Sequence, residues 1–214
     1  MIHRFRGLAA AIALLLVAHL ASAENWPQWR GPDGNGVSED TRVGPPRHLR
    51  WIHGPRWSRH HAITPSISCF ASARGRVFYV VDETPEGLGP KTPERWALVA
   101  RDAFNGTLLW RRPLADWGHA AWAKWKGDYA ERFNHPVLSK RLVAVGDIVY
   151  ATLGYRSPLV ALDASTGRQL WQSPVRATVD EVVVDGEGVY ASSYEDLQSP
   201  VLASEAAVKK RVMA

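Results

Sequence analysis

Short apolar runs entered from glycine turns recur through the middle of the chain. The segments GRVFY, GDIVY and GEGVY, at residues 75–79, 146–150 and 186–190, each place a glycine before β-branched and aromatic residues. Such residues favour extended backbone, and the glycine permits a tight bend in front of them. Each segment therefore predicts a β-strand entered from a turn.

A longer motif occurs twice behind these strands. Residues 100–110 and 161–171 align without a gap as A-x-D-A-x-[TN]-G-x-x-L-W. A weaker echo of its end stands at residues 48–51, so that the tryptophans are 59 and 61 residues apart. The residues of the repeat are Ala100, Asp102, Asn105, Gly106 and Trp110 in the first copy and Ala161, Asp163, Thr166, Gly167 and Trp171 in the second.

The residue types in the motif are those that a hairpin turn requires. An Asp before the bend can accept hydrogen bonds from backbone N–H groups two or three residues later, and the glycine can adopt the positive φ that the turn needs. The tryptophan then lies on the outgoing strand, where it can offer its apolar face to a neighbouring sheet. With the strands carrying VYATLG and LVALD before it, the unit has four short strands, as in one blade of a β-propeller.

The motif resembles the tryptophan-docking repeat of the PQQ-like β-propellers, a superfamily that includes quinoprotein alcohol dehydrogenases and the propeller lipoprotein of the outer-membrane assembly machine. The resemblance covers about residues 51–194, and the N-terminal NWPQWRGPDGNGVS is similar to exported planctomycete-type members. It implies an all-β fold, a partial propeller of four-stranded antiparallel blades with about two full blades and part of another. Because no further motif follows Tyr190, we expect a truncated ring.

The expected organisation has four parts. Residues 1–23 read as a signal peptide, residues 24–50 as a Trp- and Gly-rich arm that packs across the blades, and residues 51–198 as the propeller blades. Residues 199–214 read as a disordered or non-native tail. Within the blades, residues 114–134 form an insert.

Charge and the N-terminal segment bear on location and partners. Arg4 and Arg6 precede an apolar run of roughly 13 residues, too short to span a membrane, which ends in Ala21-Ser22-Ala23. We expect cleavage after Ala23 and a periplasmic or extracellular chain with no membrane anchor. Cleavage lowers the formal charge from +5 to +3, and the remaining cations do not suggest a nucleic-acid surface.

The sequence offers no catalytic, cofactor-binding or metal-binding residues. By resemblance a quinoprotein dehydrogenase would use a vicinal cysteine pair, a calcium or lanthanide site and a catalytic aspartate, whereas Cys69 is the only cysteine. Asp102 and Asp163 are explained by the turns, and Cys69 reads as a small buried apolar residue. PQQ is therefore not supported as a cofactor.

The insert holds the remaining candidate site. Trp117, Trp122, Trp125 and Tyr129 lie in LADWGHAAWAKWKGDYAERFN, with aromatic residues at roughly helical spacing. We interpret it as a loop at one mouth of the propeller that either caps the blades or binds an unknown protein or small molecule. The sequence favours a non-catalytic binding or scaffold module; the alternative is an N-terminal fragment of a larger enzyme, either a quinone-dependent dehydrogenase or a propeller fused to a catalytic domain such as a methyltransferase.

Overall fold

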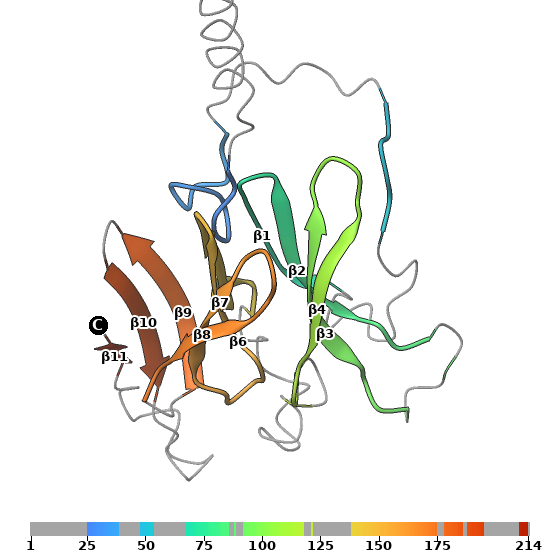
Figure 1. Ribbon diagram of the computed structural model, residues 1–214. Helices are drawn as coiled ribbons and strands as arrows, with labels where there is room; N and C mark the ends of the chain where they lie inside the picture. Colours follow the sequence, from blue (N-terminus) through green and yellow to red (C-terminus); the bar gives the residue numbers. More distant parts are fainter. Residues whose placement is uncertain are drawn as a thin grey trace, which may run out of the picture.

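The computed structural model describes residues 25–38, 48–53, 67–85, 88, 92–117, 121, 138–174, 178–185, 188–194 and 210–213. These residues form three antiparallel sheets that stand side by side (Figure 1). Residues 1–23, predicted as a signal peptide, and most of the insert lie outside the described residues. Among the residues described, no helix has the length and apolarity needed to cross a membrane.

The first two sheets are complete four-stranded blades in which each strand pairs with the next. Blade 1 contains β1 (Ile67–Ala73), β2 (Arg76–Asp82), β3 (Trp96–Asp102) and β4 (Leu108–Pro113). Blade 2 begins with a short 3₁₀ helix, η2 (Leu138–Arg141), followed by β5 (Leu142–Val145), β6 (Ile148–Thr152), β7 (Leu159–Asp163) and β8 (Gln169–Gln172). This order and these turns confirm the predicted partial propeller.

The third sheet holds β9 (Thr178–Asp185), β10 (Gly188–Tyr194) and β11 (Lys210–Met213), in the order β11-β10-β9. Within the tail that the sequence analysis delimits at residues 199–214, the described residues 210–213 form a strand that pairs with β10. In the first two blades the corresponding place, beside the second strand, is taken by β3 and β7. The third sheet is therefore a further blade with its inner strands in place.

The central strands of blade 1 are apolar almost throughout, and side chains on both faces of this blade are buried. In β2 and β3 the buried residues run consecutively, Val77–Val81 and Trp96–Ala100. One face of blade 1 packs on blade 2 in a shared core, with Phe78 and Trp110 in contact at a ring separation of 6.0 Å. A smaller core joins blade 2 to the third sheet and contains Val143, Leu159, Val179, Val182 and Ala191.

The N-terminal arm ties the inner strands of the two complete blades together. Trp26 N donates to Ser72 Oγ at 2.9 Å, and Ser72 N donates to Trp26 O at 2.7 Å on β1. The next residue, Pro27, accepts a bond from Ala144 N of β5 at 2.7 Å. Trp29 is partly exposed, with Lys140 Nζ 5.3 Å from its ring. These contacts fit the packing role expected for the arm.

Removing side-chain volume between blades 1 and 2 should destabilise the protein strongly. Leu162 is fully buried in the core between these blades, so Leu162→Ala should lower the free energy of unfolding by about 2–5 kcal/mol through lost burial and a cavity. Leu170→Ala, at a side chain 45% exposed, is the matched control and should change it by less than about 0.5 kcal/mol. Urea unfolding curves measure both; equal losses would contradict this account of the core.

Candidate functional site

The two repeated turns have the same internal geometry. Asp102 Oδ1 accepts bonds from the backbone N–H groups of Phe104 and Asn105, at 2.8 and 3.0 Å. Asp163 Oδ1 accepts from the N–H groups of Ser165 and Thr166, at 3.0 and 2.8 Å. The carboxylates therefore hold the turns, as the motif predicts.

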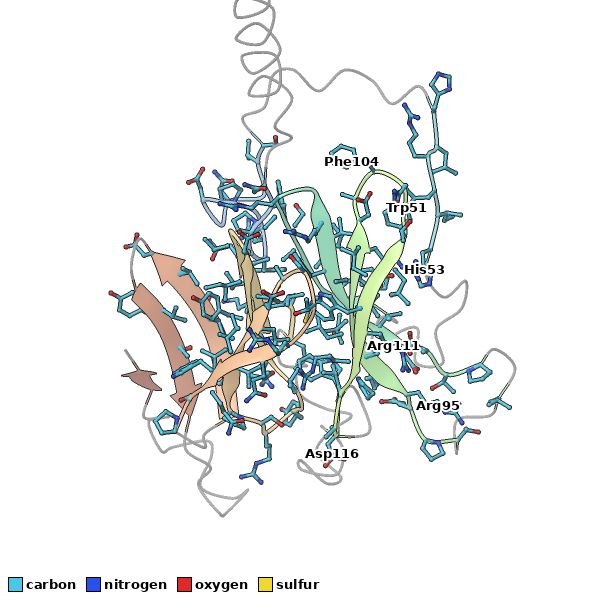
Figure 2. The ribbon with its side chains drawn as sticks, viewed as in Figure 1. Trp51, His53, Arg95, Phe104, Arg111 and Asp116 are labelled. Carbon is cyan, nitrogen blue, oxygen red and sulfur yellow. The ribbon has the colours of Figure 1, made fainter. Side chains whose placement is uncertain are left out.

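A tryptophan from the preceding segment docks onto each turn. Trp110 Nε1 donates to Ala164 O at 2.9 Å, and a Cβ on Gly167 would lie 2.7 Å from its ring. Trp51 makes the same contact with the other turn. Its Nε1 donates to Ala103 O at 3.0 Å, and a Cβ added to Gly106 would lie 2.7 Å from its ring. Figure 2 shows Trp51 beside the turn that carries Phe104. The weak echo at residues 48–51 is thus a complete docking tryptophan.

The alanine after each Asp links three parts of the structure. Ala164 N donates to Asp147 O in the β5–β6 turn of its own blade at 2.9 Å, while its carbonyl accepts from Trp110. Ala103 does the same with Gly75 O, also at 2.9 Å, and with Trp51. A small side chain at this position leaves room for both contacts, which accounts for the alanine in the motif.

Arginines that the motif does not include also hold the turns. Arg112, two residues after Trp110, donates from Nη1 to Gly167 O across the blade interface at 2.8 Å. Arg101 donates to Gly106 O at 2.6 Å and to Tyr79 Oη at 2.9 Å. Their positions differ between the copies, so the repeat gave no signal for them.

The base of the insert lies at the opposite end of the blades. Figure 2 places Phe104 of a docking turn and Asp116 at opposite ends of blade 1. Ala115 N donates to Leu153 O at 3.0 Å, and Tyr155 N donates to Asp116 O at 2.7 Å. The start of the insert is therefore fixed to the β6–β7 connection of blade 2.

A connected group of residues lies at this end of blades 1 and 2: Ser68, Cys69, Trp117, Leu138, Arg141 and Tyr155. Trp117 Nε1 donates to Ser68 Oγ at 3.0 Å, and Arg141 Nη1 donates to Tyr155 O at 2.8 Å with its guanidinium 4.8 Å from the Tyr155 ring. Trp117, one of the candidate binding residues, is 3% exposed and packs in the core that blades 1 and 2 share. Trp122, Trp125 and Tyr129 lie outside the described residues.

Cys69 is a free, buried thiol. Its Sγ donates to Leu138 O at 3.0 Å, and burial raises its pKa to about 12. A thiol in this state is neither a nucleophile nor a ready metal ligand near neutral pH. The prediction of a small buried residue is confirmed.

The repeated carboxylates and the thiol do not fit a quinone site of the kind that the resemblance describes. Asp102 and Asp163 each use Oδ1 on the turn N–H groups, and Cys69 is bonded to a backbone carbonyl inside the core. Within the described part of the chain, no three His, Cys, Asp or Glu side chains are grouped as metal ligands.

Two glycine substitutions distinguish the stability lost through the tryptophan contact from the stability lost through backbone strain. Gly167 and Gly146 both have positive φ, 70° and 59°, but only Gly167 faces a tryptophan ring; a Cβ on Gly146 meets nothing within 4 Å. Both alanine variants should lose about 1 kcal/mol from strain, and Gly167→Ala should lose about 1–3 kcal/mol more by pushing Trp110 away. Thermal and urea unfolding would give the difference; equal losses would show that the ring contact contributes nothing.

The turn aspartate should make stability depend on pH in acid. The Thr166 hydroxyl and backbone N–H lower the pKa of Asp163 below its ordinary 3.8, with smaller help from Ser165 and Arg168. A lowered folded-state pKa means that this contribution is complete above the ordinary value and is lost as the pH falls through the folded-state value. Asp163→Asn, which keeps an oxygen acceptor, should therefore show a shallower fall in unfolding free energy below about pH 4. Parallel acid titrations of the two proteins would test this.

Comparisons with known proteins agree with the repeat architecture. A family model described as "Outer membrane protein assembly factor BamB" matches residues 94–208, more than half of the chain. No curated protein matches. Among solved structures, a "Europium-containing methanol dehydrogenase" is 16% identical with a TM-score of 0.39; the match covers 61% of this chain and 22% of that one. The match runs from β3 of blade 1 through blade 2 to β10, and together with the two docking turns it shows that the chain belongs to the PQQ-like β-propeller repeat proteins.

Proposed function

We propose that this chain is a non-catalytic binding or scaffold module of an exported PQQ-like propeller. The observation that carries the proposal is the engagement of both repeated aspartates in their turns, where each carboxylate accepts at least two backbone N–H groups. A carboxylate held in this way stabilises the fold and is poorly placed to take a proton from a substrate. The buried, high-pKa thiol of Cys69 supports the same reading.

The binding surface of the module is proposed to be the insert, residues 114–134, at the end of the blades away from the docking turns. Its base is rigid because Ala115, Asp116 and Trp117 are bonded to blades 1 and 2. A fixed base with aromatic residues beyond it suits recognition of a protein or a small apolar ligand. Trp122, Trp125 and Tyr129 are the side chains proposed to contact the ligand.

Export is part of the proposal. The matching family model is named for an outer-membrane assembly factor, and the N-terminal 23 residues have the pattern of a cleaved signal peptide. These two observations support the proposed periplasmic or extracellular location. A single cysteine, Cys69, is compatible with an oxidising compartment because it is buried and has no second thiol to pair with.

A quinone-loading experiment distinguishes the module from an enzyme. The purified mature chain, incubated with pyrroloquinoline quinone and Ca²⁺ or a lanthanide and then dialysed, should retain no stoichiometric quinone absorbance. With methanol or ethanol and an artificial electron acceptor, the dye should be reduced no faster than without protein. A quinone-dependent alcohol dehydrogenase carried through the same loading is the positive control. Retained quinone with alcohol-dependent dye reduction would overturn the non-catalytic assignment.

A further inference from the structure

Two Asn-Gly pairs lie in turns of the same local geometry, one in the N-terminal arm and one in the first repeated turn. Asn35 Oδ1 accepts from Val37 N at 2.8 Å, and Asn105 Oδ1 accepts from Thr107 N at 2.8 Å. Both asparagines are exposed. In both turns the next residue is a glycine with positive φ, 82° in the arm and 74° in the repeat. Each amide side chain is therefore folded over the peptide that follows it.

This arrangement has the groups needed for deamidation through a cyclic imide. The backbone N of the glycine loses its proton to solvent and attacks the asparagine Cγ, which closes a five-membered succinimide ring. The Cγ–Nδ2 bond breaks, and Nδ2 gains a proton and leaves as ammonia. Water then opens either imide carbonyl, which gives aspartate or isoaspartate. Negative charge develops on Oδ1 during the attack, where an N–H donor stabilises it, and Val37 or Thr107 supplies that donor.

The arm turn has a further feature that favours the reaction. Arg30 Nη2 donates to Asn35 O at 3.3 Å, and this carbonyl belongs to the same peptide as Gly36 N. A cation on the carbonyl stabilises the negative charge that the peptide carries once its N–H is removed, so Gly36 N is easier to deprotonate. Gly36 N donates to Arg30 O at 2.8 Å, and breaking this bond frees the attacking nitrogen. Among the described atoms, a Cβ on Gly36 would meet only the Arg30 side chain, at 3.8 Å.

The repeat turn holds its nucleophile more firmly. Gly106 N donates to Asp102 O at 3.0 Å, and Asp102 also fixes the turn through Oδ1, which accepts from Asn105 N at 3.0 Å. Arg101 donates to Gly106 O at 2.6 Å, and the Trp51 ring lies against the glycine. Several contacts must therefore open together before Gly106 N can turn toward the amide, and such local opening costs free energy.

We propose that Asn35 is a site of deamidation in the folded protein, promoted by Arg30, and that Asn105 is protected by its turn. The product carries a new carboxylate close to Arg30, and the isoaspartate form adds one carbon to the backbone of the arm. The modified turn follows the contacts of Trp26 and Pro27 with blades 1 and 2. The reaction needs only water, and the proposal does not depend on the proposed function.

Mass spectrometry of tryptic peptides after incubation in ¹⁸O-water tests the proposal. The purified chain is kept folded at mildly alkaline pH, and trypsin then releases residues 31–42 with Asn35 and residues 102–111 with Asn105. Incorporated ¹⁸O marks the carboxyl groups that formed before digestion. Asn35 should deamidate at least tenfold faster than Asn105, and its product should be mainly isoaspartate, which marks the imide route. In urea the two rates should become similar.

Three variants distinguish the contributions to the rate. Asn35→Gln should give no product over the same time, because the longer side chain would have to close a six-membered ring. Arg30→Gln, which removes the cation, should slow the reaction at Asn35 at least threefold and leave Asn105 unchanged. Trp51→Ala is the matched control for protection. It should speed the reaction at Asn105 and leave Asn35 unchanged, whereas general unfolding would change both rates.

Three results would overturn the proposal: equal rates at Asn35 and Asn105 in the folded chain, a product at Asn35 without isoaspartate, or no reaction at Asn35 while the chain in urea reacts. An unchanged or faster rate at Asn35 in the Arg30→Gln variant would overturn the role assigned to Arg30.

Discussion

The structure depends on one contact, an indole ring laid on a turn that has no Cβ at the point of contact. The contact needs four residues at once. Asp163 fixes the turn through its N–H acceptors, Gly167 supplies the positive φ and the open face, Ala164 presents a carbonyl, and Trp110 fills the space. Losing any one of them removes the reason for the other three, which is why the motif recurs as a block rather than as separate preferences.

The central strands of blade 1 are apolar on both faces. β2 and β3 are buried almost completely, and polar groups lie at the strand ends. There they act as ties: Arg74 and Arg76 of blade 1 reach Asp147 in the β5–β6 turn of blade 2. These ion pairs are exposed and contribute little free energy individually. Their value is positional, since they join the turns next to the docked tryptophan.

Much of the fold could be predicted because repeats make local sequence informative about tertiary contacts. The repeated sequence motif predicts the strands after residues 75 and 146, the turns held by an Asp and the docking of Trp110. Trp51 shows the limit of that method, because its neighbours have lost the motif while its docking geometry is complete. The ties made by Arg101, Arg112 and Arg141 could not be predicted, since each depends on which backbone carbonyl the fold brings within reach.

Trp117 illustrates why the candidate site was harder to predict than the fold. An aromatic residue in a polar, irregular stretch looks the same in sequence whether it faces solvent or closes a core. Its indole N–H donates to Ser68 Oγ because the fold brings β1 beside Trp117, although the two residues are 49 positions apart.

The two ends of the blades therefore carry different constraints. At the docking end the repeat fixes nearly every position, so a change of residue there alters stability first. At the insert end the repeat motif places no residue, and the described start of the insert is tied to blade 2 through Ala115 and Asp116 and to blade 1 through Trp117. These ties depend on which backbone and side-chain groups the fold brings together, so a change of residue there acts through a single contact rather than through the whole motif.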